Sequence, residues 1–364
     1  MKRILIGLSL IISHLSFSSV AAQTQLTKYH PGVTPEGAVY YLPKTAMRFV
    51  VQVEKTNYTP GEFAGYAEYY LALHDVKTTP TVNYRVTDIK MTTYGEADTA
   101  KCYVVKFNVK TAASNMQLTD DGILLAINPQ SPVPNPLSAI PQPSTFTTHR
   151  PTLDPRLYLN EDILAAGSVA KRAELIAQEI LTIRESKNML TRGEADYMPK
   201  DGEQLRIMLE QLDLQNQALS QFFSGTTTCD TIEHVITLCP TTEVKNNVLF
   251  RLSQQLGLVD ADDLSGEPYY ITVEDLHTVA PPVVVEEGKK KKVPESGIYV
   301  NVPGRIRVSV TNSTKTLLTS DFLAGQFGNV ELLSGELFNK RYTTHVLLNP
   351  VTGGMEKLDA DMPR

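Results

Sequence analysis

A run of prolines between residues 129 and 155 limits the folds open to this chain more than any other feature. Eight prolines fall in this stretch, at positions 129, 132, 134, 136, 141, 143, 151 and 155. Proline has no backbone N–H and fixes φ, so the segment cannot continue as a helix or a central strand. We therefore predict a semi-rigid linker over residues 129–157, with a docking motif for an aromatic groove as the alternative.

The chain before the prolines has the pattern of a β-rich domain, which we place at residues 23–128. β-branched and aromatic residues gather in five runs separated by turn signals, at residues 39–42, 46–54, 82–94, 102–109 and 123–127. A short helix over residues 63–73 is expected to pack Phe63, Tyr66, Ala67 and Tyr70 on this sheet.

Helical periodicity follows the prolines and predicts an antiparallel helical hairpin over residues 158–225. The first stripe begins after Ser168, a plausible N-cap, and ends at Gly193. The second begins after Asp201, which forms a capping-box pattern with Gln204. The apolar stripes comprise Val169, Ala173, Ile176, Ile180, Ile183 and Leu190, and then Leu205, Met208, Leu209, Leu212, Leu219, Phe222 and Phe223.

Residues 226–364 return to short β-rich runs and form our predicted C-terminal domain. Strands are expected at residues 248–252, 269–273, 298–302, 306–311 and 343–348, followed by a closing hairpin. The fold class is therefore α+β: short-stranded, mostly antiparallel β domains with an inserted antiparallel helical hairpin.

An internal echo suggests that the two β-rich parts are duplicates, with coincidence as the alternative. Residues 37–43 and 297–303 both consist of Gly, five residues and Pro at the start of a strand. Each part also closes with Leu-Leu shortly before Asn-Pro, at residues 124–129 and 347–350.

The N-terminus has the order of a secretory signal, which we place at residues 1–22. Lys2 and Arg3 precede nine apolar residues, and small residues lead to cleavage between Ala22 and Gln23. No later run reaches the length of a membrane-spanning helix. We therefore expect an exported chain, periplasmic or outer-membrane-associated, with no transmembrane segment after the signal is removed.

Two of the three cysteines lie close together in the sequence. Cys229 and Cys239 are ten residues apart, and an oxidising compartment would let them form a disulfide. Two free thiols whose side chains point apart are the alternative. We interpret Cys102 as a small buried strand residue.

The composition excludes several function classes. A net charge of −6, with one short lysine run at residues 289–292, argues against nucleic-acid binding. That run is a solvated loop or a contact for anionic lipid or glycan phosphate. Without zinc-ligand pairs, a Gly-x-Ser-x-Gly elbow, a P-loop or a dinucleotide fingerprint, we predict no metal and no cofactor.

The only clustered acids are Asp260, Asp262, Asp263 and Glu267. They are weak catalytic candidates, because glycoside hydrolysis needs two carboxyl groups that face each other across a cleft. A solvated turn with local aspartate caps is the alternative interpretation of this segment.

Several segments carry a resemblance to a known family: Tyr41-Leu42-Pro43, residues 49–53 and 65–71, Asp121-Gly122-Ile123-Leu124-Leu125, and residues 249–253 and 261–270. They resemble an uncharacterised domain-of-unknown-function family of exported, signal-bearing proteins from Bacteroides-type bacteria. The likeness covers nearly all of the mature chain and brings no known activity. It implies that Asp98-Thr99-Ala100 and Asp230-Thr231-Ile232 are similar to O-glycan acceptor motifs, with Thr99 and Thr231 as acceptors.

We expect from these features a soluble envelope protein that binds or scaffolds an envelope protein or glycan without catalysis. A large core without a recognisable reactive motif favours this reading. The alternative is a hydrolase acting on cell-envelope glycan or peptide through the acidic cluster.

Overall fold

The computed structural model describes residues 38–105, 115–134, 146–147, 153–280, 297–338 and 343–361. The strands of the first part are β1 (Ala38–Thr59), β2 (Thr81–Val105), β3 (Met116–Leu118), β4 (Leu124–Ile127) and β5 (Phe146–Thr147). The helices are η1 (Ala64–Tyr66), α1 (Ala67–Leu71), η3 (Pro155–Tyr158), α2 (Glu161–Ala165), α3 (Val169–Arg192), α4 (Gly202–Ser224) and η4 (Gly335–Phe338). The remaining strands are β6 (Thr226–Leu238), β7 (Val244–Ser253), β8 (Gly257–Val259), β9 (Glu267–Asp275), β10 (Gly297–Thr311), β11 (Thr316–Ser334), β12 (Thr343–Leu348) and β13 (Met355–Asp361).

The strands form three sheets. Sheet 1 has the order β2-β1-β6-β5, sheet 2 the order β11-β10-β9-β7-β8, and sheet 3 the order β13-β12-β4-β3. Neighbouring strands in these sheets are antiparallel. The prediction of a β-rich, mostly antiparallel fold is thus confirmed.

The strands are much longer than the predicted short strands. β1 has 22 residues and β2 has 25, because each passes through a position that the sequence pattern marks as a break. At Pro43 a register shift lets β1 continue without the missing N–H. Gly95 pairs with Thr45 inside β2, and a Cβ there would lie 2.1 Å from the Pro350 carbonyl oxygen. Gly95 therefore serves a close backbone approach and not a turn.

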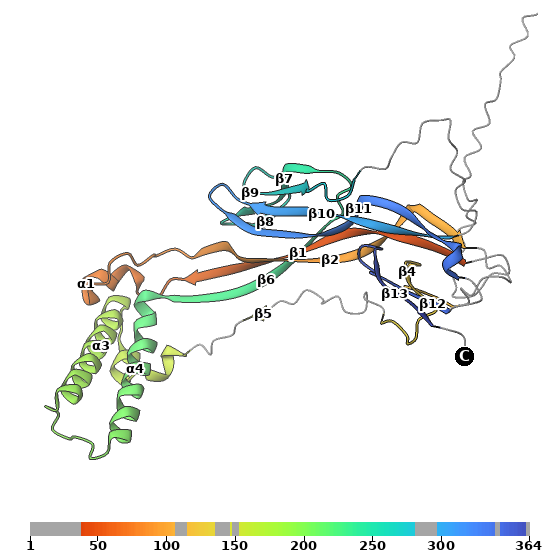
Figure 1. The fold of residues 1–364 in the computed structure, drawn as a ribbon. Coiled ribbons are helices and arrows are strands. Elements are labelled where there is room, and N and C mark those ends of the chain that lie inside the picture. The colour runs from red at the N-terminus through yellow and green to blue at the C-terminus, as the bar shows by residue number, and fades with distance from the viewer. Residues whose placement is uncertain are drawn as a thin grey trace, which may run out of the picture.

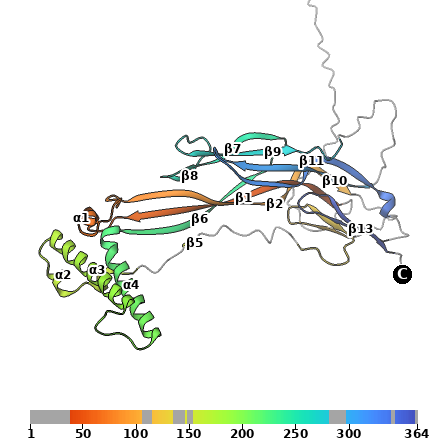
Figure 2. The same ribbon diagram turned by 60° about the vertical axis from the view of Figure 1, so that its left-hand side comes forward.

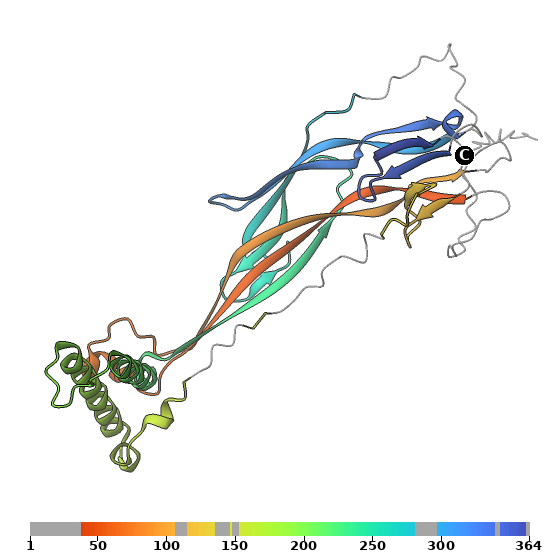
Figure 3. The same ribbon diagram turned by 60° about the horizontal axis from the view of Figure 1, so that its bottom comes forward.

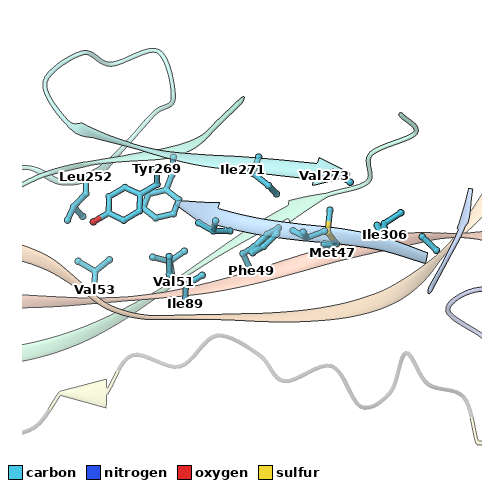
Figure 4. Close-up of a cluster of buried hydrophobic side chains, with 14 residues drawn as sticks. Met47, Phe49, Val51, Val53, Ile89, Leu252, Tyr269, Ile271, Val273 and Ile306 are labelled. Carbon is cyan, nitrogen blue, oxygen red and sulfur yellow. The ribbon is translucent and has the colours of Figure 1, made fainter. Parts of the chain in front are cut away.

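The two β-rich parts of the sequence share their sheets and their cores. Sheet 1 pairs β1 with β6, and sheet 3 pairs β4 with β12. Side chains of β1 and β2 meet those of sheet 2 in a central cluster (Figure 4), which includes Met47, Phe49, Val51, Phe250, Ile271 and Val308. The described residues therefore do not divide into the separate domains that we placed at 23–128 and 226–364.

A second core, the tyrosine cluster, joins the two echoed segments. It contains Tyr40, Leu42, Leu124, Ile127, Ile298, Val300, Phe338, Val346 and Leu348. Tyr41 N–H donates to the Gly122 carbonyl at 2.9 Å, and Asn301 N–H donates to the Gly353 carbonyl at 3.1 Å. Tyr41 and Asn301 occupy the same place in the echo, and both glycines have positive φ in a hairpin turn. The β3–β4 hairpin thus corresponds to the β12–β13 hairpin, and this correspondence supports duplication. Leu124-Leu125 follows its hairpin turn, whereas Leu347-Leu348 precedes its own, so the two Leu-Leu pairs do not correspond.

All the described helices except η4 pack with one another at one end of an elongated molecule (Figures 1, 2 and 3), whereas η4 lies at the tyrosine cluster. We call η1–α1 and η3–α4 the head. Arg184 Nε donates to Asn216 at 3.2 Å, and Lys187 pairs with Asp213, so α3 and α4 lie antiparallel. Ser168 and Asp201 cap the helices and Gly193 ends α3, as the sequence predicts.

The prediction that residues 63–73 pack on the sheet is wrong. Phe63, Ala67 and Leu71 lie in a head cluster with Ile176, Ile180, Leu219 and Phe223. No residue of β1 after Val53 is buried, because from that point β1 no longer packs against sheet 2. It continues to the head together with β2 and β6 (Figure 1). With no apolar sheet face at this point, the short helix buries its apolar side on the longer helices.

The apolar stripes of the hairpin are buried in part. Ala173, Ile176, Ile180, Ile183 and Leu190 of α3 are buried, but Val169 is 54% exposed in the first turn. In α4, Leu219, Phe222 and Phe223 are buried, whereas Met208 near the far tip is 36% exposed. The buried residues of α4 all lie in the half nearest the strands, whereas Leu205, Leu209 and Leu212 are partly buried.

Candidate functional site

A cleft with a volume of about 950 Å³ lies where sheet 2 packs over β2. Three segments far apart in the sequence form it: residues 84–89 of β2, residues within 252–269, from the β7–β8 turn to the start of β9, and residues within 312–317, at the turn from β10 to β11. Its polar lining includes Arg85, Thr87, Asp88, Ser253, Gln254, Gln255, Ser265, Glu267, Asn312 and Lys315.

Tyr84 joins β2 to the turn from β7 to β8. Its backbone N–H donates to the Gln254 carbonyl at 2.8 Å. Its ring lies over Gly257, where a Cβ would approach the ring to 3.2 Å. The Lys55 ammonium lies 5.8 Å from the centre of the same ring. These contacts fix the β7–β8 turn against β2, so the exposed side chains of Gln254 and Gln255 stand on a rigid support.

Asn312 fixes the turn from β10 to β11. Its side-chain oxygen accepts from the N–H groups of Thr314 and Lys315 at 3.1 and 2.9 Å, and so closes the β10–β11 turn. The Asn312 side chain also hydrogen-bonds to Tyr269, which stacks on Phe250 with ring centroids 4.5 Å apart. Burial, followed by the nearby Glu267 charge, raises the pKa of Tyr269. The Tyr269 ring is a core contact, so it offers no open face for stacking a sugar.

Most of the charged side chains in the cleft have local partners. Arg85 donates to Glu54 at 2.8 Å, and this hydrogen bond lowers the pKa of the Glu54 carboxyl. Glu267 accepts from the Ser313 hydroxyl. Groups of three or more potential metal ligands are absent from the described residues. The arrangement provides many hydrogen-bond donors and acceptors in an open, water-accessible space.

The predicted acidic cluster is mostly outside the cleft. Asp260, Asp262 and Asp263 lie exposed on the loop between β8 and β9, and only Glu267 lines the cleft. Ser265 N–H donates to Asp263 at 2.9 Å, and this bond lowers the pKa of Asp263. This hydrogen bond is a local aspartate cap of the kind that the turn interpretation of this segment predicts.

Cys229 and Cys239 do not form the disulfide that the sequence left open. All three cysteines of the chain are free. β6 is extended from Thr226 to Leu238, so ten residues separate the two cysteines by roughly 30 Å. A disulfide requires Cα atoms within about 7 Å, and the strand cannot bend back because β1 pairs along its length.

The two motif threonines have different surroundings. β1 pairs with Cys102 and next with Ala97, so exposed Thr99 lies in a bulge of β2. Asp98 is buried beside Lys44 at 3.5 Å. Thr231 is half-buried in β6, between Glu54 of β1 and Phe146 of β5. The expected cleavage site at Ala22 and Gln23 and the lysine run at 289–292 lie outside the described residues.

The sequence interpretation missed most of the cleft. Glu267 was singled out, but Tyr84, Gln254, Gln255 and Asn312 were not. The polar turns between strands were visible signals, but such turns occur in most β-rich proteins. Only the packing of sheet 2 against β2 brings the three segments together.

No helix of the described residues is long and apolar enough to cross a membrane. Comparisons with curated proteins and with solved structures found no match. A family model, a domain of unknown function (DUF4831), matches residues 36–356, which include every described element before the start of β13. On this match over most of its length, the chain belongs to the DUF4831 family.

Proposed function

We propose that this protein is an exported, non-catalytic binding protein of the cell envelope and that its cleft holds a glycan. The carrying observation is the cleft of about 950 Å³, lined by amide, hydroxyl and charged side chains on three braced segments. A glycan presents many hydroxyl groups, which exchange hydrogen bonds with such side chains. The volume lies within the range common for ligand sites.

The rigidity of the cleft turns indicates that the cleft is a binding site and not only a polar part of the surface. A ligand that must order flexible loops loses affinity to that ordering. Here the hydrogen bond from Tyr84 to Gln254 and the cap by Asn312 already fix the two turns. The side chains of Gln254 and Gln255 are exposed and can be changed without disturbing the fold.

Calorimetry with a panel of oligosaccharides from envelope polysaccharides tests the proposal. We expect at least one to bind, and the double variant Gln254→Ala, Gln255→Ala to weaken it about tenfold, equivalent to roughly 1.4 kcal/mol. Gln204→Ala, an exposed glutamine in α4, is the matched control and should bind as the wild type does. Absence of binding across the panel, or equal binding by the double variant, would refute the proposal.

The location of Glu267 in the cleft favours one second candidate, a hydrolase acting on the same glycan or on peptide. Hydrolysis of a glycoside requires two carboxyl groups on opposite sides of the bond. Glu267 and Asp88 are the acids that line this cleft. Release of reducing ends by the wild type, abolished in Glu267→Gln while binding persists, would replace the binding proposal with this one.

Export is the part of the proposal that rests on residues 1–22. We infer that the mature chain begins at Gln23. Fractionation of cells and N-terminal sequencing of the purified protein test this. A mature protein that retains Lys2 and Arg3 would contradict it.

A further inference from the structure

Three of the four charged side chains that line the cleft have partners. Arg85 pairs with Glu54 at 2.8 Å. Asp88 accepts from the Ile89 N–H at 2.9 Å and lies 3.7 Å from the Lys90 ammonium. Glu267 accepts from Ser313. Each of these groups has at least part of its hydrogen-bonding capacity used within the chain.

Lys315 is the exception. It is exposed on the cleft wall, and its ammonium has no ion pair with any described residue. Its backbone is fixed on both sides, because its N–H donates to Asn312 Oδ1 at 2.9 Å and its carbonyl accepts from the Asn312 N–H at 3.0 Å. The turn therefore fixes the point on the cleft wall from which this side chain extends, while the ammonium itself stays free to reach a ligand.

We infer that the cleft selects an anionic glycan, whose carboxylate or phosphate binds the Lys315 ammonium. This inference rests on the proposed glycan-binding function. A ligand that fills the cleft removes water from the ammonium, and an unpaired cation loses hydration at a large cost. A ligand anion restores that interaction with a charge-assisted hydrogen bond, which a neutral hydroxyl matches only in part.

The carboxylates of the cleft do not cancel this preference. Lys90 lies beside Asp88, and Ser313 donates to Glu267, so both carboxylates already have donors within the chain. The amides of Gln254 and Gln255 remain to bind sugar hydroxyl groups whatever the charge of the ligand. Charge selection and sugar recognition are therefore carried by different side chains and can be separated by mutation.

Calorimetry with matched pairs of sugars tests the inference. One pair is tri-galacturonic acid and its methyl ester, which differ in charge but share the backbone. The other is maltotriose with and without a phosphate, which distinguishes phosphate from carboxylate as the source. We expect about a tenfold preference for at least one anionic member at low salt, decreasing as the ionic strength rises.

Lys315→Gln should reduce to near unity the ratio between the affinities for the anionic and the neutral sugar of each pair. Lys245→Gln, an exposed lysine in β7 outside the cleft, removes the same charge and should keep the preference. Equal binding of charged and neutral sugars by the wild type would overturn this inference and leave glycan binding intact. A preference that survives in Lys315→Gln would overturn it in the same way. If neither these sugars nor the envelope panel bind, the proposed function fails with it.

Discussion

Tyr40 connects the two echoed segments through a single hydroxyl group. The side chain is fully buried, and the hydroxyl donates to the Tyr299 carbonyl at 3.2 Å and accepts from the Tyr299 N–H at 2.8 Å. We expect Tyr40→Phe to lower the free energy of unfolding by about 1–3 kcal/mol, because both backbone groups lose their partner. Urea denaturation measures the change.

Tyr69→Phe is the matched control for this substitution. Tyr69 is 82% exposed, so loss of its hydroxyl should change stability by less than about 0.5 kcal/mol. A Tyr40→Phe variant as stable as this control would mean that water or a shift of the backbone satisfies the Tyr299 groups.

The ion pair between Arg307 and Asp321 should make stability depend on pH. Arg307 donates two hydrogen bonds to Asp321 at 2.8 Å, and these hold the pKa of Asp321 below its ordinary value. A lowered pKa stabilises the fold above the unfolded pKa, and this contribution is lost as the pH falls through the folded pKa. Arg307→Gln should therefore lower the urea midpoint near pH 7, and its difference from the wild type should shrink as the pH falls below the ordinary aspartate pKa of about 3.9.

Lys245→Gln provides the comparison for Arg307→Gln, because it removes one exposed positive charge from β7. Its effect on the midpoint should be small at both pH values. A difference between Arg307→Gln and the wild type that stays constant from neutral to acid pH would assign the effect to packing of the arginine stem.

The head has a core of its own and should open by itself. Phe63 is fully buried, with its ring 5.8 and 5.9 Å from those of Phe222 and Phe223. Phe63→Ala should destabilise the head by about 3–5 kcal/mol. Hydrogen exchange should then accelerate in α3 and α4, while the amides of β9 and β10 keep their protection. Faster exchange in every element alike would show that the head and the sheets unfold together.

Local patterns predicted the helices better than the strands. Ser168, Gly193 and Asp201 act within one turn of themselves, so the sequence places the ends of α3 and the start of α4. Pro43 and Gly95 have the local pattern of breaks, because the residues that let a strand pass through them are remote. Pro350, which approaches Gly95, is more than 250 residues away in the sequence.

The candidate site was less predictable for the same reason. A spacing rule can find ligands on one helix or loop, but the cleft draws on three segments that meet only when sheet 2 packs on β2. Glu267 was found because it follows a visible cluster of acids. The possible disulfide between Cys229 and Cys239 relied on their short separation in the sequence. On an extended strand, however, ten residues place the two thiols far apart in space.

The whole molecule depends on its last strands. β12 pairs with β4, and the Asn128 side chain donates to the Thr344 carbonyl across 216 positions of sequence. A chain that stops at residue 338 lacks β12 and β13 and leaves the tyrosine cluster without Val346 and Leu348. We expect this truncated chain to bind a hydrophobic dye and to be cut rapidly by protease. A chain ending at residue 361 should resist both.

The path of β1 has a consequence for biosynthesis. This strand contributes Tyr40 and Leu42 to one core and Met47 and Phe49 to another, yet its partners in both include residues near the C-terminus. A ribosome delivers β1 about 300 residues before β12, so the apolar face of β1 must wait for nearly the entire chain. Folding that relies on such distant contacts is slow and leaves intermediates open to aggregation. We therefore expect a chaperone that shields β1 to raise the yield of folded protein when the unfolded chain is refolded.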